Sequence, residues 1–173
     1  MALFSADIAI VTFGCGGVRV ARDFAGLSID DSLPILNASG GTPMAEAVNL
    51  ALEILEKRKD EYRSKGVDYY QPWLVLMTDG QPDSLRELER PIARTNELIN
   101  NKKLTIFPIG IGNYADMEIL AKFSPKRPPL KLQGLKFKEF FAWLSQSVSR
   151  TSQSTPGESV KLDFEGIKGW GEL

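Results

Sequence analysis

Residues 73–80, with the sequence WLVLMTDG, decide the fold class of this chain. The apolar run Trp73–Thr78 shows no polar alternation, which is typical of a parallel strand that helices cover on both faces. The run stops at Asp79-Gly80, a residue pair that favours a tight turn. It therefore predicts a central strand of an α/β sheet. Asp79 should stand at the carboxyl edge of that sheet, where such folds bind ligands.

The N-terminal part of the chain predicts a β-hairpin. Asp7–Phe13 (DIAIVTF) and Val18–Phe24 (VRVARDF) are short β-branched runs, and the glycine-rich segment Gly14–Gly17 joins them. Two strands with so short a link favour antiparallel pairing. A phosphate-binding glycine loop is the alternative, but it requires a helix directly after the glycines, and the β-branched VRV argues against one.

A long helix is predicted after the segment SGGTP at residues 39–43. Thr42 suits the N-cap position and Pro43 suits the first helical position. The last turns, Glu56–Lys65, are charged and expected to be exposed, and Gly66 ends the helix. One apolar face is expected, formed by Met44, Val48, Ala51, Leu52 and Leu55.

Strand and helix patterns continue to alternate after the decisive strand, which favours a mainly parallel sheet. Pro91 should start or kink the first of these helices, and Pro108 predicts a bulge or an edge position for the next strand. The expected elements are a helix over Ser84–Asn100, a strand over Leu104–Ile111, a short helix over Asp116–Phe123, a strand over Pro129–Gln133 and an amphipathic helix with Phe137, Phe140, Phe141, Leu144 and Val148 on one face.

Residues 1–173 are expected to form a single domain, with a core over about residues 7–150 and a C-terminal extension over residues 151–173. The composition becomes rich in Ser, Thr, Gln and Gly after Ser149, as in a linker. Beyond it, Ser159–Phe164 alternates apolar and polar residues and predicts a terminal strand. Trp170 is expected to anchor the tail on the domain.

Composition excludes several classes of function. The chain has no histidine, which excludes Ser-His-Asp and Cys-His catalysis and most zinc sites, and its single cysteine, Cys15, excludes an intrachain disulfide. Its 21 Lys and Arg nearly balance its 22 Asp and Glu, so no basic field favours nucleic acid or a membrane surface. A cytoplasmic location is expected, because neither a signal peptide nor an apolar run of about 18 residues is found.

Thr42 and Asp79 are the predicted metal ligands. A βα connection would bring the helix start at Thr42 to the same sheet edge as Asp79. A hydroxyl and a carboxylate are hard oxygen donors, which suit Mg²⁺ or Mn²⁺ better than zinc. Both residues also have a purely structural interpretation, because Thr-Pro commonly starts helices and Asp-Gly commonly forms turns.

Several motifs together resemble a von Willebrand factor A (vWA) domain of the bacterial TerY type, which is associated with tellurite-resistance clusters. They are SGGTP at 39–43, MTDGQPD at 77–83, FPIGIG at 107–112 and KFKEFFAWLSQSVS at 136–149. The resemblance implies a three-layer, Rossmann-like α/β sandwich with a mainly parallel sheet. It also implies a metal-ion-dependent adhesion site, to which Thr42 and Asp79 correspond and in which Ser39, Gly40 and Gly41 form the loop.

The chain departs from this family pattern at its start. No DxSxS motif, which supplies further metal ligands in the family, occurs in the sequence. Asp7–Phe13 corresponds to the family's second strand, so the resemblance implies an N-terminally shortened form that lacks the first central strand and its helix. Metal affinity should then be weak or absent. The sheet should close up, recruit a strand from another chain, as in a homodimer through exposed sheet edges, or keep exposed edges.

The resemblance implies a non-enzymatic protein-binding module in which a partner's carboxylate completes the metal coordination. The implied partners are a protein kinase or a PP2C-type phosphatase of the same cluster, and Asp83, Asn113 and Tyr114 would form the rim of the interface. A Mg²⁺-dependent phosphotransfer enzyme with Asp79 as nucleophile is one alternative, although no Walker motif is present. A metal-independent structural or assembly protein is the other.

Overall fold

The computed structural model describes residues 6–26, 34–37, 39–134, 136–152, 165–167, 169 and 171–172. The predicted strand Ser159–Phe164 and the anchoring Trp170 lie outside the described residues. The chain divides into two compact units, the first comprising Met1–Asp68 and Pro82–Pro91 and the second Tyr69–Gln81 and Ile92–Leu173. No helix in the described part of the chain is long and apolar enough to span a membrane.

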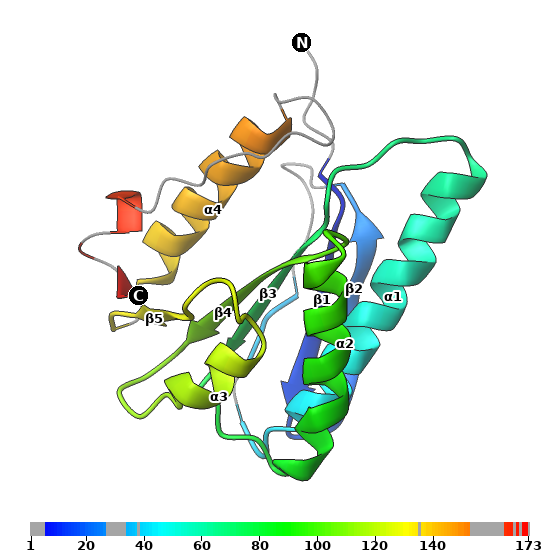
Figure 1. Cartoon of the computed structure of the whole chain (residues 1–173). Helices are drawn as coiled ribbons and strands as arrows, with labels where there is room; N and C mark the ends of the chain where they lie inside the picture. Colours follow the sequence, from blue (N-terminus) through cyan, green and yellow to red (C-terminus); the bar gives the residue numbers. More distant parts are fainter. Residues whose placement is uncertain are drawn as a thin grey trace. The chain divides into compact units, whose positions relative to one another are not determined.

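The first unit begins with the predicted hairpin, formed by β1 (Ile8–Gly14) and β2 (Gly17–Ala25) in antiparallel pairing (Figure 1). The link is shorter than the predicted four-residue segment, because Gly14 already pairs with Gly17. Only Cys15 and Gly16 remain in the turn, and Gly16 has φ +97°. Such two-residue turns need positive φ, which glycine adopts without strain. A strand follows these glycines, so the phosphate-loop alternative is wrong.

Helix α1 (Met44–Ser64) packs against this hairpin and buries the predicted apolar face, including Met44, Val48, Leu52 and Leu55. Its start differs from the prediction. Pro43 has a non-helical ψ of 60°, and no side chain caps the helix. The carbonyl of Thr42, and not its hydroxyl, accepts a hydrogen bond from the Met44 amide, at 2.7 Å.

The C-terminal turns of α1 are less exposed than their charge predicts. Lys59 is only 4% exposed. Its Nζ lies 2.6 Å from Glu56 Oε1, which is still partly exposed. The long aliphatic stem of a lysine can be buried while its amine reaches a partner near the surface, and this explains why the predicted exposure is wrong here.

Asp7 connects the start of β1 to the C-terminal half of α1. Its Oδ2 accepts hydrogen bonds from Arg58 Nε, at 3.0 Å, from Arg58 Nη2 and from the Tyr62 hydroxyl. Arg58 also lies over the Tyr62 ring, 4.8 Å from its centroid. Burial acts to raise the pKa of Asp7, but the hydrogen bonds from Tyr62 and Arg58 and the charge of Arg58 outweigh it and lower that pKa.

We expect Asp7→Asn to lower the free energy of unfolding by about 2 kcal/mol at pH 7, because hydrogen bonds to a charged group contribute about 1.5–3 kcal/mol. The pKa of Asp7 is lower in the folded chain than its ordinary value of 3.8. The stabilisation is therefore complete above that value and is lost as the pH falls through the folded-state pKa. Urea unfolding at a series of pH values measures both effects.

Asp60→Asn is the matched control, because Asp60 pairs with Arg63 on the same helix at an exposed position. Exposed pairs contribute about 1 kcal/mol or less, so this variant should unfold almost like the unmodified chain. Equal pH dependence of the unmodified chain and the Asp7→Asn variant between about pH 5 and pH 2 would contradict the assignment.

The second unit contains the sheet that residues 73–80 predict. Strands β3 (Trp73–Thr78), β4 (Thr105–Gly110) and β5 (Leu130–Leu132) are parallel, and β6 (Gly171–Glu172) is antiparallel to β5. The sheet order is β3-β4-β5-β6. Within the described residues β3 pairs only with β4, and β1 only with β2. The strand whose sequence predicts a central position therefore has one described neighbour, and β6 was not predicted.

Pro108 lies in the middle of β4, whose register with β3 is continuous, so the predicted bulge is wrong. Toward β5, however, no described strand pairs at this residue, which matches the predicted edge position. The amides of Thr105 and Ile111 donate to carbonyls of the β3 segment, which places the odd-numbered amides of β4 on that side. The nitrogen of Pro108 therefore faces the side of β5. Because β5 pairs only from Ile109 onward, no ladder hydrogen bond is lost at the proline.

The helices of the C-terminal part follow the predicted order. The segment predicted as one helix is divided into η1 (Arg86–Leu88) and α2 (Glu89–Asn100), with Pro91 in the first turn of α2. Helix α3 (Met117–Lys122) is capped by Asp116, whose Oδ1 accepts from the Ile119 amide at 3.0 Å. Helices α4 (Phe137–Ser152) and η2 (Glu165–Ile167) complete the described elements.

The core of the second unit lies between α4 and one face of the sheet (Figure 1). Phe140 is fully buried there, whereas Phe141 is 50% exposed, so the predicted core position of Phe141 is wrong. Successive helix residues point about 100° apart, and Trp143 occupies the place that was assigned to Phe141. The buried cluster comprises Phe107, Ile109, Leu130, Leu132, Phe140, Trp143 and Ile167.

Candidate functional site

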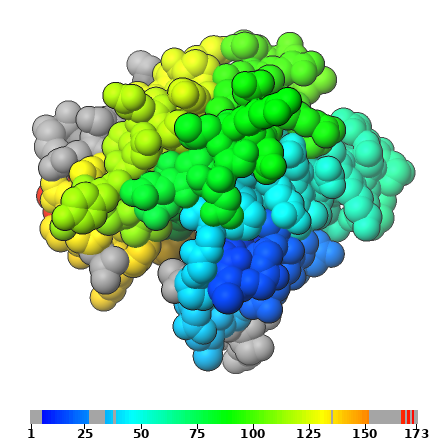
Figure 2. All heavy atoms as spheres, turned by 90° about the horizontal axis from the view of Figure 1, so that it is seen from below, coloured from blue at the N-terminus to red at the C-terminus, as the bar shows by residue number. Residues whose placement is uncertain are grey.

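The SGGT loop of the first unit rests on the turn of the hairpin. The Cys15 amide donates to the Ser39 carbonyl at 2.6 Å. A Cβ atom on Gly40, which has φ +78°, would lie 2.7 Å from the Cys15 backbone. Glycine is therefore required for this close approach. Figure 2 shows the cyan segment that leads into α1 lying directly against the blue hairpin.

Asp83 holds the other side of the same loop. Its Oδ1 accepts a hydrogen bond from the Thr42 amide at 2.7 Å, and its own amide donates to the Thr42 carbonyl at 3.1 Å. A Cβ atom on Gly41 would lie 2.8 Å from Asp83 Oδ2. Among the described residues, the Thr42 hydroxyl makes no hydrogen bond. The loop is thus fixed through its backbone.

Asp79 stands in the second unit, directly after β3, with an exposed side chain. Its Oδ1 accepts from the Gln81 amide at 3.1 Å, and its carbonyl accepts from the Asp116 amide at 2.7 Å. Gly80 has φ +73°, and a Cβ atom there would lie 2.6 Å from the Asp116 carbonyl oxygen. The turn after β3 is therefore packed against the loop that follows β4.

The two predicted rim residues of that loop are exposed. Tyr114 is 87% exposed, and its carbonyl accepts from Gln81 Nε2 at 3.0 Å. The carbonyl of Asn113 accepts from Lys131 Nζ at 3.3 Å. These bonds hold the loop through its backbone, and the side chain of Tyr114 is exposed to solvent.

The predicted site residues thus fall into two groups. Ser39–Gly41, Thr42 and Asp83 come together in the first unit, and Asp79, Asn113 and Tyr114 come together in the second. The convergence of Thr42 with Asp79 stays a prediction. The contact between Asp83 and Thr42 was not predicted, because nothing in the MTDGQPD motif indicates a partner 41 positions earlier in the chain.

The available donors suit a hard cation in kind. A threonine hydroxyl and carboxylate oxygens match the preference of Mg²⁺ and Mn²⁺. The metal ligands that the chain could supply are few. The described residues contain no group of three or more His, Cys, Asp or Glu that could hold a metal ion. The Thr42 hydroxyl and the Asp79 carboxylate are each, taken alone, the type of oxygen donor that magnesium accepts beside several water ligands.

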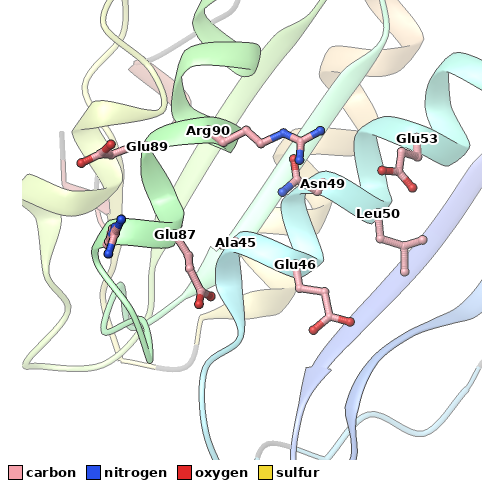
Figure 3. A pocket seen from close by; sticks show the side chains of 9 residues that line it. Ala45, Glu46, Asn49, Leu50, Glu53, Glu87, Glu89 and Arg90 are labelled. Atoms are coloured by element: carbon pink, nitrogen blue, oxygen red, sulfur yellow. The ribbon is translucent and has the colours of Figure 1, made fainter.

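A separate cavity of about 880 Å³ lies beside α1 in the first unit (Figure 3). In Figure 3 the Arg90 side chain points toward Asn49, whose Oδ1 is buried without a hydrogen-bond partner among the described residues. None of the predicted metal ligands lines this cavity. Its lining consists of Ala45, Glu46, Asn49, Leu50, Glu53, Arg86, Glu87, Glu89 and Arg90.

Comparison with known proteins gives one assignment. No curated protein and no solved structure matches the chain. Residues 5–132 match the family model of the von Willebrand factor type A domain. This match includes the hairpin, the SGGT loop, the strand that ends at Asp79 and the following α/β elements up to β5. The chain therefore belongs to the von Willebrand factor type A domain family.

Proposed function

We propose that this chain is a protein-binding module in which Thr42 and Asp79 hold Mg²⁺ or Mn²⁺ and a carboxylate of the partner protein completes the coordination. The observation that carries the proposal is the Thr42 hydroxyl, which makes no hydrogen bond to another described residue although its loop is held on two sides. A bound cation would supply positive charge for the partner's carboxylate. The residues of this chain would hold and orient that cation.

The finer assignment is to the TerY type of vWA proteins in a bacterial cytoplasm, with a tellurite-resistance kinase or PP2C-type phosphatase as the partner. The order of the motifs SGGTP, MTDGQPD and FPIGIG supports it. Metal binding is proposed to be weak, because the sequence contains no DxSxS motif. Association of two copies through sheet edges is supported by the pairing of β3 with β4 alone among the described strands.

Binding is preferred to catalysis on chemical grounds. The chain has no histidine, the commonest general acid–base group, to activate the water that would hydrolyse a phosphoaspartate formed at Asp79. The Asp79 carboxylate is held in a turn by the Gln81 amide, which suits a fixed ligand. If Mg²⁺-dependent phosphate release from a generic phosphoester were observed and were lost in Asp79→Asn, the enzyme would be the correct alternative.

We expect Thr42→Ala and Asp79→Asn each to weaken Mn²⁺ binding by at least about tenfold, since losing even an outer partner of a metal site costs about 10–100-fold in affinity. Electron paramagnetic resonance of free Mn²⁺ measures the affinity, and competition with Mg²⁺ extends it to the smaller ion. Glu87→Gln is the control, because Glu87 is an exposed acid on η1.

Unchanged Mn²⁺ affinity in both Thr42→Ala and Asp79→Asn would contradict the proposed site. A pulldown from the source cell extract that is insensitive to EDTA and to Thr42→Ala would favour the metal-independent assembly protein.

A further inference from the structure

We propose that Asp83 is the positioning residue of the site, which fixes the Thr42 loop through hydrogen bonds rather than by binding the cation. This inference rests on the proposed function only in taking the Thr42 hydroxyl as a metal ligand. The hydrogen bonds that carry it lie entirely within the first unit.

Two hydrogen bonds of opposite direction join Asp83 and Thr42, which are 41 positions apart in the chain. The Thr42 amide donates to Asp83 Oδ1 at 2.7 Å, and the Asp83 amide donates to the Thr42 carbonyl at 3.1 Å. The first is charge-assisted, so it is stronger than a bond between neutral groups. Together they determine both the position and the orientation of the Thr42 peptide groups.

This arrangement also explains why Thr42 does not cap α1. A capping threonine turns its hydroxyl toward the amides of the first helical turn. Here Asp83 holds the Thr42 backbone, Pro43 keeps a non-helical ψ of 60°, and no side chain caps the helix. The Thr42 hydroxyl is therefore not used by the helix. A negative charge beside the helix start is also favoured by the helix dipole.

Gly41 provides the space for the Asp83 carboxylate. A Cβ atom at this position would lie 2.8 Å from Oδ2 and 2.9 Å from Oδ1. Gly41 does not have positive φ, so its backbone could accommodate an alanine. The added methyl group would clash with the Asp83 carboxylate. The two glycines of SGGT are thus required for two different contacts. Gly40 permits the contact with Cys15, and Gly41 permits the contact with Asp83.

Asparagine and alanine at position 83 separate positioning from metal binding. Asn retains an oxygen that can accept from the Thr42 amide but carries no charge, whereas Ala has no acceptor. For a positioning residue, we expect Asp83→Ala to accelerate hydrogen exchange of the Thr42 amide by about tenfold or more. Asp83→Asn should stay within about threefold of the unmodified chain. Amide exchange by NMR, without metal, measures this directly.

Gly41→Ala is the second variant, in case Asp83→Ala fails to fold. It should displace the carboxylate and accelerate exchange of the Thr42 amide with Asp83 still present. Glu87→Ala is the matched control, since it removes an exposed acid from the neighbouring η1 and should leave the exchange rate unchanged. Retained protection of the Thr42 amide in both Asp83→Ala and Gly41→Ala would overturn the proposal.

Mn²⁺ affinity supplies the second measurement. Asp83→Ala should weaken binding about as much as Thr42→Ala, and Asp83→Asn should restore most of it. Equal loss in Asp83→Asn and Asp83→Ala would make Asp83 a direct ligand and would overturn positioning. If Thr42→Ala and Asp79→Asn leave Mn²⁺ binding unchanged, the proposed function fails, and the amide exchange still decides the role of Asp83 in holding the loop.

Discussion

Replacing Phe140 with alanine should lower the free energy of unfolding by about 4 kcal/mol. Phe140 is fully buried in the cluster between α4 and the sheet. Its ring lies 6.2 Å from that of Trp143, so the lost side chain leaves a cavity beside another large aromatic residue. Large cavities cannot be closed by small movements in a close-packed core, and their cost adds to that of the lost burial. Urea unfolding monitored by circular dichroism measures the change.

Phe141→Ala is the control for this prediction. Phe141 is 50% exposed, and its ring contacts Phe140 edge-on with the centroids 5.2 Å apart. Such an aromatic pair contributes about 0.5–1.5 kcal/mol, so the loss should stay near 1 kcal/mol. Similar losses for Phe140→Ala and Phe141→Ala would show that the assigned face of α4 is wrong.

Gly80→Ala should lower the free energy of unfolding by about 3 kcal/mol, since backbone strain of this kind costs about 1–3 kcal/mol and a steric clash adds to it. The position has φ +73°, and the new Cβ atom would lie 2.6 Å from the Asp116 carbonyl oxygen. The neighbour is backbone, so it cannot rotate away as a side chain would. Thermal and urea unfolding of the variant measure the effect.

Gly112→Ala separates the two causes of that loss. Gly112 also has positive φ, +89°, but an added Cβ atom would have no neighbour within 4 Å. Only the conformational cost should remain, which is about 1–2 kcal/mol for a left-handed residue. If Gly80→Ala were no more harmful than Gly112→Ala, the close packing of the turn after β3 on the loop after β4 would be contradicted.

Most of the fold could be predicted from local patterns. The β-branched runs around the glycines predict the hairpin, and WLVLMT predicts β3. Helix α1 is predicted by the spacing of Met44, Val48, Leu52 and Leu55. The strand β6 could not be predicted, because Gly171 and Glu172 have no periodicity and pair through their backbone with β5. The place of Pro108 depends on how short β5 is, which no pattern in β4 itself reveals.

For the candidate site, local patterns indicate where single residues lie and not which residues meet. Asp79 follows an apolar strand and Thr42 precedes a helix, so local signals place each at the end of an element. The hydrogen bonds between Asp83 and Thr42 connect positions 41 residues apart, and a single sequence contains no local sign of such a contact. In the sequence, Asp83 has the features of an ordinary turn residue. Only the fold brings it to the Thr42 loop.

The packing of the turn after β3 against the loop after β4 has a consequence for the affinity of any partner. Residues 79–81 and the loop from Gly112 to Asp116 are already joined by backbone and side-chain hydrogen bonds in the chain alone. Complexes lose affinity when flexible segments must become ordered during association. Because these bonds already restrict the loops, part of their conformational entropy is lost on folding, and a partner that bound at Tyr114 would lose less affinity to their ordering.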